Sequence, residues 1–271
     1  MKKRLTFYVP VFKSAAFLIS ELKKINKKIF FEKCDLIISL NSVSQNEIDA
    51  LSEINESVIL IKNSEPLSIN ENWTLGLARI KTDYFKINSS NDPFEYEKIL
   101  EIIENIPEGL LLMGKTKFKG VDNKWVEKVN AFRTGFNGFN KFEKFRSFFL
   151  DNSYGDISGY VFPYSVVEEI NIRKKFLLTP MQSFPDYGLI LMGISNSKSV
   201  ITFDEDFGFY IADQDAPVNR RNEWHMYYRE YRIERLARYI FDSNSYERKV
   251  IGSNLILKIL GVIFLCKWSL R

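Results

Sequence analysis

The chain has 271 residues and a mass of 31.8 kDa, enough for one large domain with a substantial hydrophobic core. A net charge of +4 is too small to indicate nucleic-acid binding by itself, and the two cysteines lack the spacing of a zinc site. The basic residues at the start precede an apolar run that Pro10 and Lys13 interrupt before it reaches the length of a signal peptide. We therefore expect a cytoplasmic protein with free thiols.

Short apolar runs alternate with amphipathic segments through the first part of the chain. We expect strands at residues 5–12, 35–40, 58–61 and 84–87, and helices at residues 14–25, 45–54 and 72–80. This alternation predicts an α/β fold in which a mostly parallel sheet carries helices on both faces. Such sheets bind ligands at the carboxyl ends of their strands, so we expect the loops after Val9, Leu40 and Ile87 to form the site.

The rest of the chain has a weaker pattern. We expect a helix at residues 96–106, a strand at 110–113, further elements at 157–161, 165–172, 186–192 and 199–203, and a long helix at 223–241. The stretch 114–155 is rich in Lys, Phe, Asn and Gly and has little periodicity, which indicates that part of it is a mobile loop.

Three motifs lie along these predicted elements, in chain order. They are Tyr8-Val9-Pro10-Val11-Phe12, Ile38-Ser39-Leu40-Asn41-Ser42-Val43-Ser44, and the stretch from Asn72 to Phe94, NWTLGLARIKTDYFKINSSNDPF. In order and spacing they resemble the family 2 glycosyltransferases over about residues 5–220. The resemblance implies a GT-A fold with a nucleotide-sugar-binding half (1–113), an acceptor-side half (114–220) and a C-terminal helical extension (221–271).

The same resemblance implies a reaction, the transfer of a sugar from a nucleoside diphosphate sugar to a hydroxyl group. It favours a UDP-sugar as donor, a glycan or lipid-linked acceptor, inversion at the anomeric carbon, and a place in bacterial surface polysaccharide synthesis. Leu40, Ser90 and Asn91 stand where the family has acids. A second hypothesis is therefore a catalytically inactive binding or scaffold protein with this fold.

The resemblance assigns donor binding to residues of the three motifs, namely Pro10, Val11, Phe12, Asn41, Asn72, Trp73, Asn91 and Asp92. Phe12 takes the place of an aromatic residue that stacks on the donor's base, a task that needs only a π face. The alternative is a core phenylalanine at the end of a strand. Asn41 takes the place of a carboxylate that reads the base or ribose, and its amide still donates and accepts hydrogen bonds.

A divalent cation, Mn²⁺ or Mg²⁺, is implied at the turn Ser90-Asn91-Asp92, where the family has an acidic pair that holds the cation on the donor's diphosphate. One carboxylate with phosphate and water oxygens can bind such a cation, although with lower affinity. Asp213 stands near the place of a family histidine at this cation, and we expect it to supply a second carboxylate. The alternatives are an Asn-Asp-Pro turn without a ligand and a solvated acid in a loop.

The acceptor side is implied by two further segments. The glycine-rich run at residues 155–159 resembles an acceptor-side strand of the family, in which Ser158 and Gly159 would let a sugar ring approach the backbone. Asp186, after Pro185, takes the place of the general base of inverting members, where it would accept the proton of the acceptor hydroxyl. The alternative for Asp186 is an N-cap of the helix that follows.

The C-terminal segment 248–271 combines basic residues with an apolar stretch at residues 255–266. This stretch is shorter than the roughly 20 residues that span a bilayer, so we expect an interfacial helix that rests on anionic lipid and keeps the protein peripheral at the membrane. A helix packed on the domain or on another subunit is the alternative. The single histidine, His225, has no second histidine to form a metal site, and we expect no nucleic-acid partner.

Overall fold

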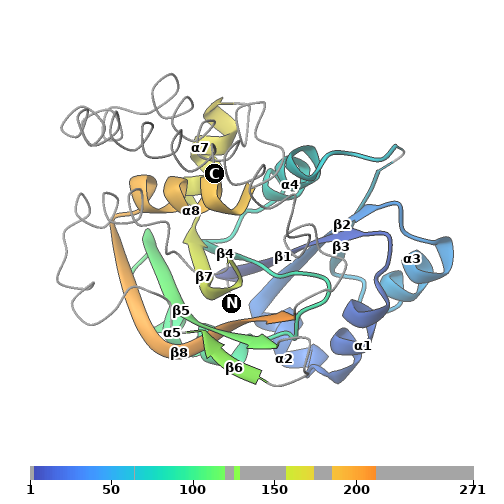
Figure 1. Ribbon diagram of the computed structural model, residues 1–271, viewed down its shortest axis with the longest axis horizontal. Helices are drawn as coiled ribbons and strands as arrows, with labels where there is room; N and C mark the ends of the chain where they lie inside the picture. Colours follow the sequence, from blue (N-terminus) through green and yellow to red (C-terminus); the bar gives the residue numbers. More distant parts are fainter. Residues whose placement is uncertain (1–2, 64, 120–124, 129–156, 174–184, 212–271) are drawn as a thin grey trace, which may run out of the picture.

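The computed structural model describes residues 3–63, 65–119, 125–128, 157–173 and 185–211 (Figure 1). The strands are β1 (Leu5–Phe12), β2 (Cys34–Asn41), β3 (Val58–Lys62), β4 (Tyr84–Ile87), β5 (Leu110–Lys119), β6 (Trp125–Lys128), β7 (Tyr160–Pro163) and β8 (Ser199–Ile211). The helices are α1 (Ala16–Lys24), α2 (Lys27–Lys33), α3 (Gln45–Ser52), α4 (Ile69–Leu77), α5 (Glu97–Glu104), α7 (Ser165–Arg173) and α8 (Pro185–Asn196), with a 3-10 helix η2 (Ile157–Gly159). The expected helices at 221–271, and Asp213, lie outside the described residues.

Within the described ranges the strands form one eight-stranded sheet with the order β3-β2-β1-β4-β7-β5-β6, and β8 pairs with β5. Strands β1 to β4 run parallel to one another, β7 is antiparallel to both β4 and β5, and β8 is parallel to β5. Strands β1 to β4 are connected through helices, since parallel pairing needs crossover connections, and the predicted α/β class is confirmed.

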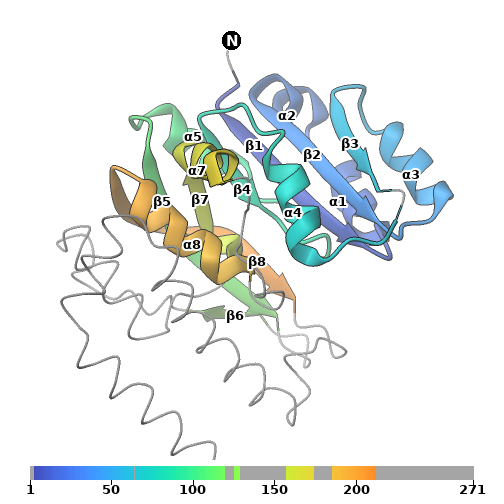
Figure 2. The same ribbon diagram turned by 90° about the horizontal axis from the view of Figure 1, so that it is seen from above.

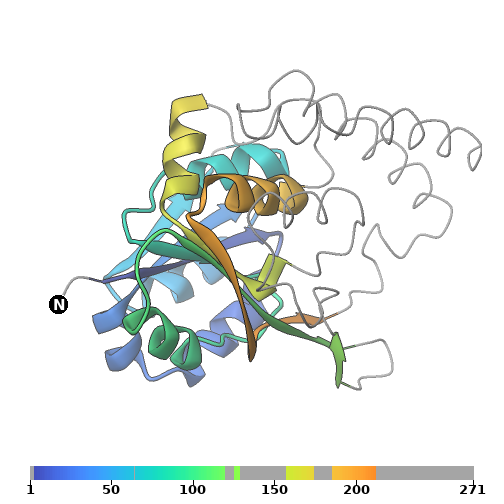
Figure 3. The same ribbon diagram turned by 90° about the vertical axis from the view of Figure 1, so that its left-hand side faces the viewer.

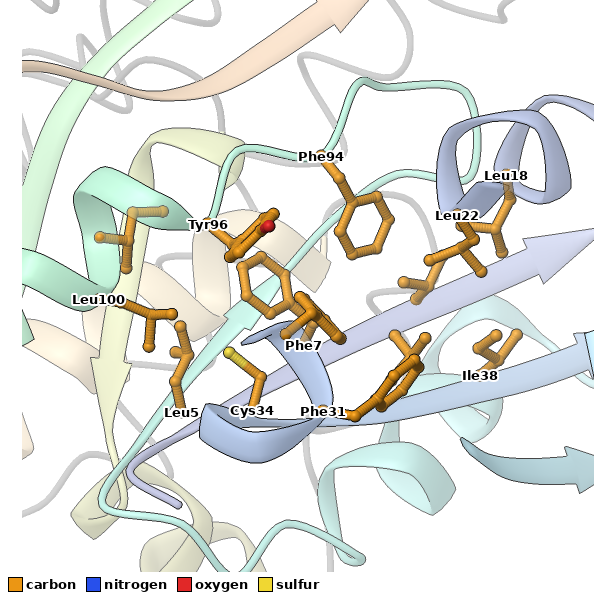
Figure 4. Packing of buried hydrophobic residues seen from close by; sticks show 14 of the residues in the cluster. Leu5, Phe7, Leu18, Leu22, Phe31, Cys34, Ile38, Phe94, Tyr96 and Leu100 are labelled. Carbon is orange, nitrogen blue, oxygen red and sulfur yellow. The ribbon is translucent and has the colours of Figure 1, made fainter. Parts of the chain in front are cut away.

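Helices cover both faces of the sheet, and each face has its own hydrophobic core (Figures 2 and 3). One core packs α4, α7 and α8 against the sheet, and the other packs α1, α2, α3 and α5 against it. Figure 4 shows part of the second core, in which the ring of Phe7 lies 5.3 Å from that of Phe94, centroid to centroid. Aromatic residues make up 15% of the chain, and some of them fill this core.

Cys34 lies in the same core, where it is a free and fully buried cysteine. Burial raises the pKa of its thiol to about 12, so the thiol stays protonated and unreactive at neutral pH. This agrees with the expected free thiols for Cys34, while Cys266 lies outside the described residues. No helix in the described ranges is long and apolar enough to cross a membrane.

Several predicted boundaries were wrong, for local and for tertiary reasons. Helix α4 begins at Ile69 rather than at residue 72, because Ser68 and Glu71 form a capping box whose side chains bond each other's backbone N–H groups. The short helix α2 was missed, although Asn26 caps it by accepting a hydrogen bond from the Ile29 N–H at 3.3 Å. Such brief helices have too few turns for a clear apolar period.

The expected mobile loop from residue 114 is partly strand. Residues 114–119 continue β5, which pairs with β6 on one side and with β8 on the other, and β8 itself runs on to Ile211. The β5 extension is polar and basic, and the β8 extension begins with three acids, two of which form ion pairs with Lys115 and Lys117. Pairing between these distant segments is what makes them regular. The rest of the expected loop, apart from β6, lies outside the described residues.

Candidate active site

The carboxyl ends of β1 and β2 lie side by side, since Phe12 pairs with Asn41 in the parallel register. Val11 is buried at 1% exposure, whereas the side chain of Phe12 is 59% exposed. The backbone N–H of Lys13 donates to the Asn41 carbonyl at 3.0 Å and ties the two strand ends together. Phe12 is therefore not a core phenylalanine but an aromatic face presented at the edge where such sheets bind ligands.

Asn41 is buried and its side-chain amide is already engaged. Its Nδ2 donates to the Leu67 carbonyl at 2.7 Å, and its Oδ1 accepts from the Leu67 N–H at 3.1 Å. An asparagine that bonds both backbone groups of one residue fixes the path of that loop. The predicted contact of Asn41 with a base or ribose is untested, and the described geometry gives it a positioning role before α4.

Asn72 and Trp73 lie on α4, beneath the same edge. The Asn72 Oδ1 accepts from Asn63 Nδ2 at 3.0 Å, and its carbonyl accepts from the buried Tyr8 hydroxyl at 2.8 Å. Trp73 is 6% exposed and packs in the core under the sheet. Asn72 and Trp73 thus hold α4 and the loop before it in place. Burial raises the pKa of the Tyr8 hydroxyl, which therefore stays a neutral hydrogen-bond donor.

The turn after β4 joins the first half of the sheet to β8. Asp92 is 3% exposed, and its Oδ1 accepts a hydrogen bond from the Ile211 N–H at 3.2 Å. The buried Asn88 donates from Nδ2 to the Asp92 carbonyl at 3.2 Å, while Asn91 is exposed. The end of β8, two residues before Asp213, therefore lies against Asp92, although Asp213 itself is outside the described residues.

Ser158 and Gly159 lie at the same edge, but in the 3-10 helix η2 rather than in the predicted strand. Since Phe85 pairs with Phe162 in antiparallel register, η2 comes before β7 beside the carboxyl end of β4. The helix is held there from both sides. Lys86 on β4, fully buried, donates from Nζ to the Ser158 carbonyl, and Gly208 on β8 packs so closely that a Cβ would lie 2.2 Å from that carbonyl oxygen.

Lys86 was not among the predicted site residues. A lysine in the centre of the apolar strand Tyr84-Phe85-Lys86-Ile87 is an unusual core residue, and this was the available signal. A buried ammonium needs hydrogen-bond partners to offset its desolvation, and a backbone carbonyl of η2 is one of them. Lys86 therefore orients η2 from its position on β4.

Asp186 is the second residue of α8, after Pro185 in the first helical position. It is therefore a first-turn acid rather than the N-cap that was the alternative. The Gly193 backbone lies against the Phe162 ring, and the Ser165 hydroxyl donates to the Asn196 carbonyl at 2.9 Å, so the end of α8 lies beside the end of β7. The start of α8 lies toward η2, and Asp186 is partly exposed there.

The oxygen donors at the turn after β4 suit a hard cation. The described residues contain no group of three or more His, Cys, Asp or Glu side chains that could hold a metal ion. Beside Asp92, however, the buried Asn88 Oδ1 has no hydrogen-bond partner in the described structure. One carboxylate with amide oxygens fits Mg²⁺ or Mn²⁺ that takes its other ligands from phosphates and water.

No family model and no curated protein sequence matches the chain, but solved structures do. The chain is similar to TarS from S. aureus in complex with UDP-GlcNAc, with a TM-score of 0.60 and 11% identity over 93% of this chain and 71% of that one. It is also similar to the mannosyltransferase PcManGT from Pyrobaculum calidifontis in complex with GDP-Man and Mn²⁺, with a TM-score of 0.57 and 10% identity over 99% and 84%.

The chain is shorter than these proteins. It spans 65% of the TarS 1–349 structure, with a TM-score of 0.58, 11% identity and 85% of this chain covered. It spans 43% of the longer TarS structure, with a TM-score of 0.62 and 10% identity over 93% of this chain. At such low identities the similarity establishes the fold, which is the GT-A-type α/β fold that the sequence predicted.

Proposed function

We propose that the chain is a glycosyltransferase that transfers a sugar from a nucleoside diphosphate sugar to an acceptor hydroxyl. The observation that carries this proposal is the meeting of several predicted site residues at one sheet edge. Phe12 at the end of β1, Asp92 after β4 and Ser158 before β7 are each positioned by hydrogen bonds or strand register. The solved structures with UDP-GlcNAc and GDP-Man support a nucleotide sugar as donor.

The donor would lie along the ends of β1 and β4. Phe12 offers an exposed ring for stacking on the base, with Pro10 and Val11 shaping the strand end below it. Asn91 and Asp92 lie where the diphosphate would be. Asp92, joined by Asp213, would hold Mn²⁺ or Mg²⁺, which when bound supplies Lewis-acid stabilisation of the leaving phosphate. A UDP-sugar is the donor we favour.

The acceptor would lie between η2 and the start of α8. Ser158 and Gly159 would border it, and the Asp186 carboxylate would accept the proton of the attacking hydroxyl. The acceptor oxygen forms a bond to the anomeric carbon as the bond from that carbon to the diphosphate breaks on the opposite side. The sugar is thereby transferred with inversion, the proton ends on Asp186, and the nucleoside diphosphate leaves.

The acceptor class follows from the same resemblance. We propose a glycan or lipid-linked hydroxyl in bacterial surface polysaccharide synthesis, reached from the cytoplasmic face of a membrane. The basic and apolar segment 248–271 would supply the peripheral contact with anionic lipid.

The first test is donor binding, measured as the thermal shift of the purified protein with UDP, GDP, UDP-GlcNAc and GDP-Man, with and without Mn²⁺. A ligand that binds the native state stabilises it by RT ln(1 + [L]/Kd), about 2.7 kcal/mol at a hundredfold excess over Kd. We expect a shift for one base, larger with Mn²⁺. No shift at millimolar ligand would contradict the proposal and favour the inactive scaffold.

The second test separates binding from chemistry. Asp186→Asn is expected to keep the thermal shift with the donor and to lose sugar transfer, because it keeps the size of the side chain but cannot accept the proton. Asp92→Asn is expected to keep the acceptor for the Ile211 N–H and to weaken the Mn²⁺-dependent part of donor binding. If both variants transfer sugar like the wild type, these two residues are not the site.

A further inference from the structure

Lys13 follows β1 in a backbone conformation that lysine rarely adopts. Its φ is 67°, and Lys13 and Ser42 are the non-glycine residues of the described structure with positive φ. Left-handed backbone is disfavoured for residues with a Cβ and least so for asparagine and aspartate, so glycine or asparagine would form this turn with less strain. Such strain at a ligand-binding edge calls for a reason in the side chain.

The turn itself does not need a lysine. Its backbone bonds run from the Lys13 N–H to the Asn41 carbonyl at 3.0 Å and from the Ser14 N–H to the Phe12 carbonyl at 2.9 Å. Any residue with an N–H group makes the first of them. The side chain is exposed and is not part of either core.

The ammonium of Lys13 lies beside the exposed aromatic face. Its Nζ is 5.1 Å from the centroid of the Phe12 ring, which is itself 59% exposed. In the described part of the chain no carboxylate forms an ion pair with Lys13. Glu47 is close in the fold but bonds Ser14 Oγ at 2.8 Å and the Ala15 N–H at 2.9 Å. The charge is thus available for an anionic ligand.

We propose that Lys13 binds the diphosphate of the donor while Phe12 stacks on its base. This rests on the proposed function and adds a residue to that site. The flexible four-carbon stem of lysine lets the ammonium move from the ring to a phosphate oxygen without a backbone change. Lys13 would also offset part of the negative charge of the diphosphate. The turn after β4 supplies Asp92 as its one carboxylate in the run Ser90-Asn91-Asp92. Diphosphate binding at this site therefore depends less on a divalent cation than it would at a site with two carboxylates and no lysine.

The test compares nucleoside, monophosphate and diphosphate on the same protein by isothermal titration calorimetry, in the uridine or guanosine series that shifts the wild type. The variants are Lys13→Gln, which removes the charge, and Lys13→Asn, which also favours the left-handed turn. Lys23→Gln, on the exposed last turn of α1, is the charge-matched control. Melting temperatures show whether each variant is folded.

For both Lys13 variants we expect a Kd for the diphosphate about tenfold higher than for the wild type, the usual size of one charge-assisted hydrogen bond. The nucleoside is expected to bind within about twofold of the wild type, and added salt is expected to reduce the difference. Lys13→Asn is expected to melt at or above the wild-type temperature, so a binding loss there is not a folding loss. In the Lys13 variants diphosphate binding should also depend more steeply on Mn²⁺.

Unchanged diphosphate binding in both variants, or equal losses for nucleoside and diphosphate, would overturn the role of the charge. A wild type that binds none of the nucleotides would instead overturn the proposed function itself. The wild-type titration therefore distinguishes the two failures.

Discussion

The two halves of this molecule are built on different principles. From β1 to α5 the chain alternates strand and helix, and each strand pairs in parallel with one nearby in the same series. From β5 onward the strands are mixed in direction, and β5 pairs with β8, whose residues are far away in sequence. The candidate site lies where the halves meet. We therefore expect substitutions at this junction to have larger effects than substitutions within either half.

The largest expected effect is at Gly208, where the second half presses on η2. A Cβ at this position would lie 2.2 Å from the Ser158 carbonyl oxygen, a backbone atom that no side-chain rotation can move. We expect Gly208→Ala to lower the free energy of unfolding by about 3 kcal/mol, at the upper end for overpacking. Urea denaturation of the wild type and the variant measures this loss of unfolding free energy.

Gly193→Ala is the matched control, in helix α8. The atoms nearest to its Cβ would be side-chain atoms of Phe162 and Leu111, at 3.0 to 3.1 Å, and alanine favours the helix by about 1 kcal/mol. A change within about 1 kcal/mol is expected. Equal losses in the two variants would show that the junction at η2 is no more rigid than the helix layer.

The next effect is at Lys86, which joins the first half to η2. In Lys86→Met the long side chain keeps its volume and the buried charge is removed, so we expect stability to change by less than about 2 kcal/mol. The Ser158 carbonyl loses its donor, η2 shifts, and sugar transfer is expected to fall at least about tenfold, since small misplacements of a site are costly.

The measurement for Lys86 is kcat/KM set beside the melting temperature. A variant that loses stability and transfer in proportion would indicate that Lys86 only supports folding. A loss of transfer with donor binding intact would place its effect on the acceptor side.

A smaller effect is expected within the first half, at Tyr8. Its hydroxyl lies 2.7 Å from Ser39 Oγ and 2.8 Å from the Asn72 carbonyl. Tyr8→Phe leaves buried polar groups without this partner, which costs about 1–2 kcal/mol of unfolding free energy. Ser39→Ala and the double variant complete a thermodynamic cycle, and a double loss equal to the sum of the single losses would show that the pair is not coupled.

The smallest effect is at Glu95, whose pKa is raised by burial and then by the nearby Asp206. Between the ordinary glutamate pKa and the raised one, the folded protein holds a proton that the unfolded chain has lost, so stability falls as pH rises through this window. Glu95→Gln is expected to stabilise the protein at pH 7 by about 0.5 kcal/mol or less, and not below the ordinary pKa. Melting temperatures from pH 4 to pH 8 check this, with the exposed Glu56→Gln as control.

The site was predictable to different depths in the two halves. Phe12 and Asp92 could be placed at this sheet edge from the sequence because a strand end and an Asn-Asp-Pro turn are local features, and their binding roles stay predictions. The positioning role of Asn41 was not found, since its bonds to Leu67 cross a loop. Lys86 was missed because its partner, the Ser158 carbonyl, is brought to it by antiparallel pairing.

The sequence by itself determined the α/β class and the strands β1 to β4, and it predicted the sheet edge at which we propose that the ligand binds. These follow from apolar periods and from the rule that parallel strands end together, which are properties of contiguous segments. Only the tertiary structure decided the length of β5 and β8, the conversion of the glycine-rich run into η2, and the approach of Ile211 to Asp92. Long-range pairing supplies hydrogen bonds that no local pattern encodes, and it brought η2 to the carboxyl end of β4.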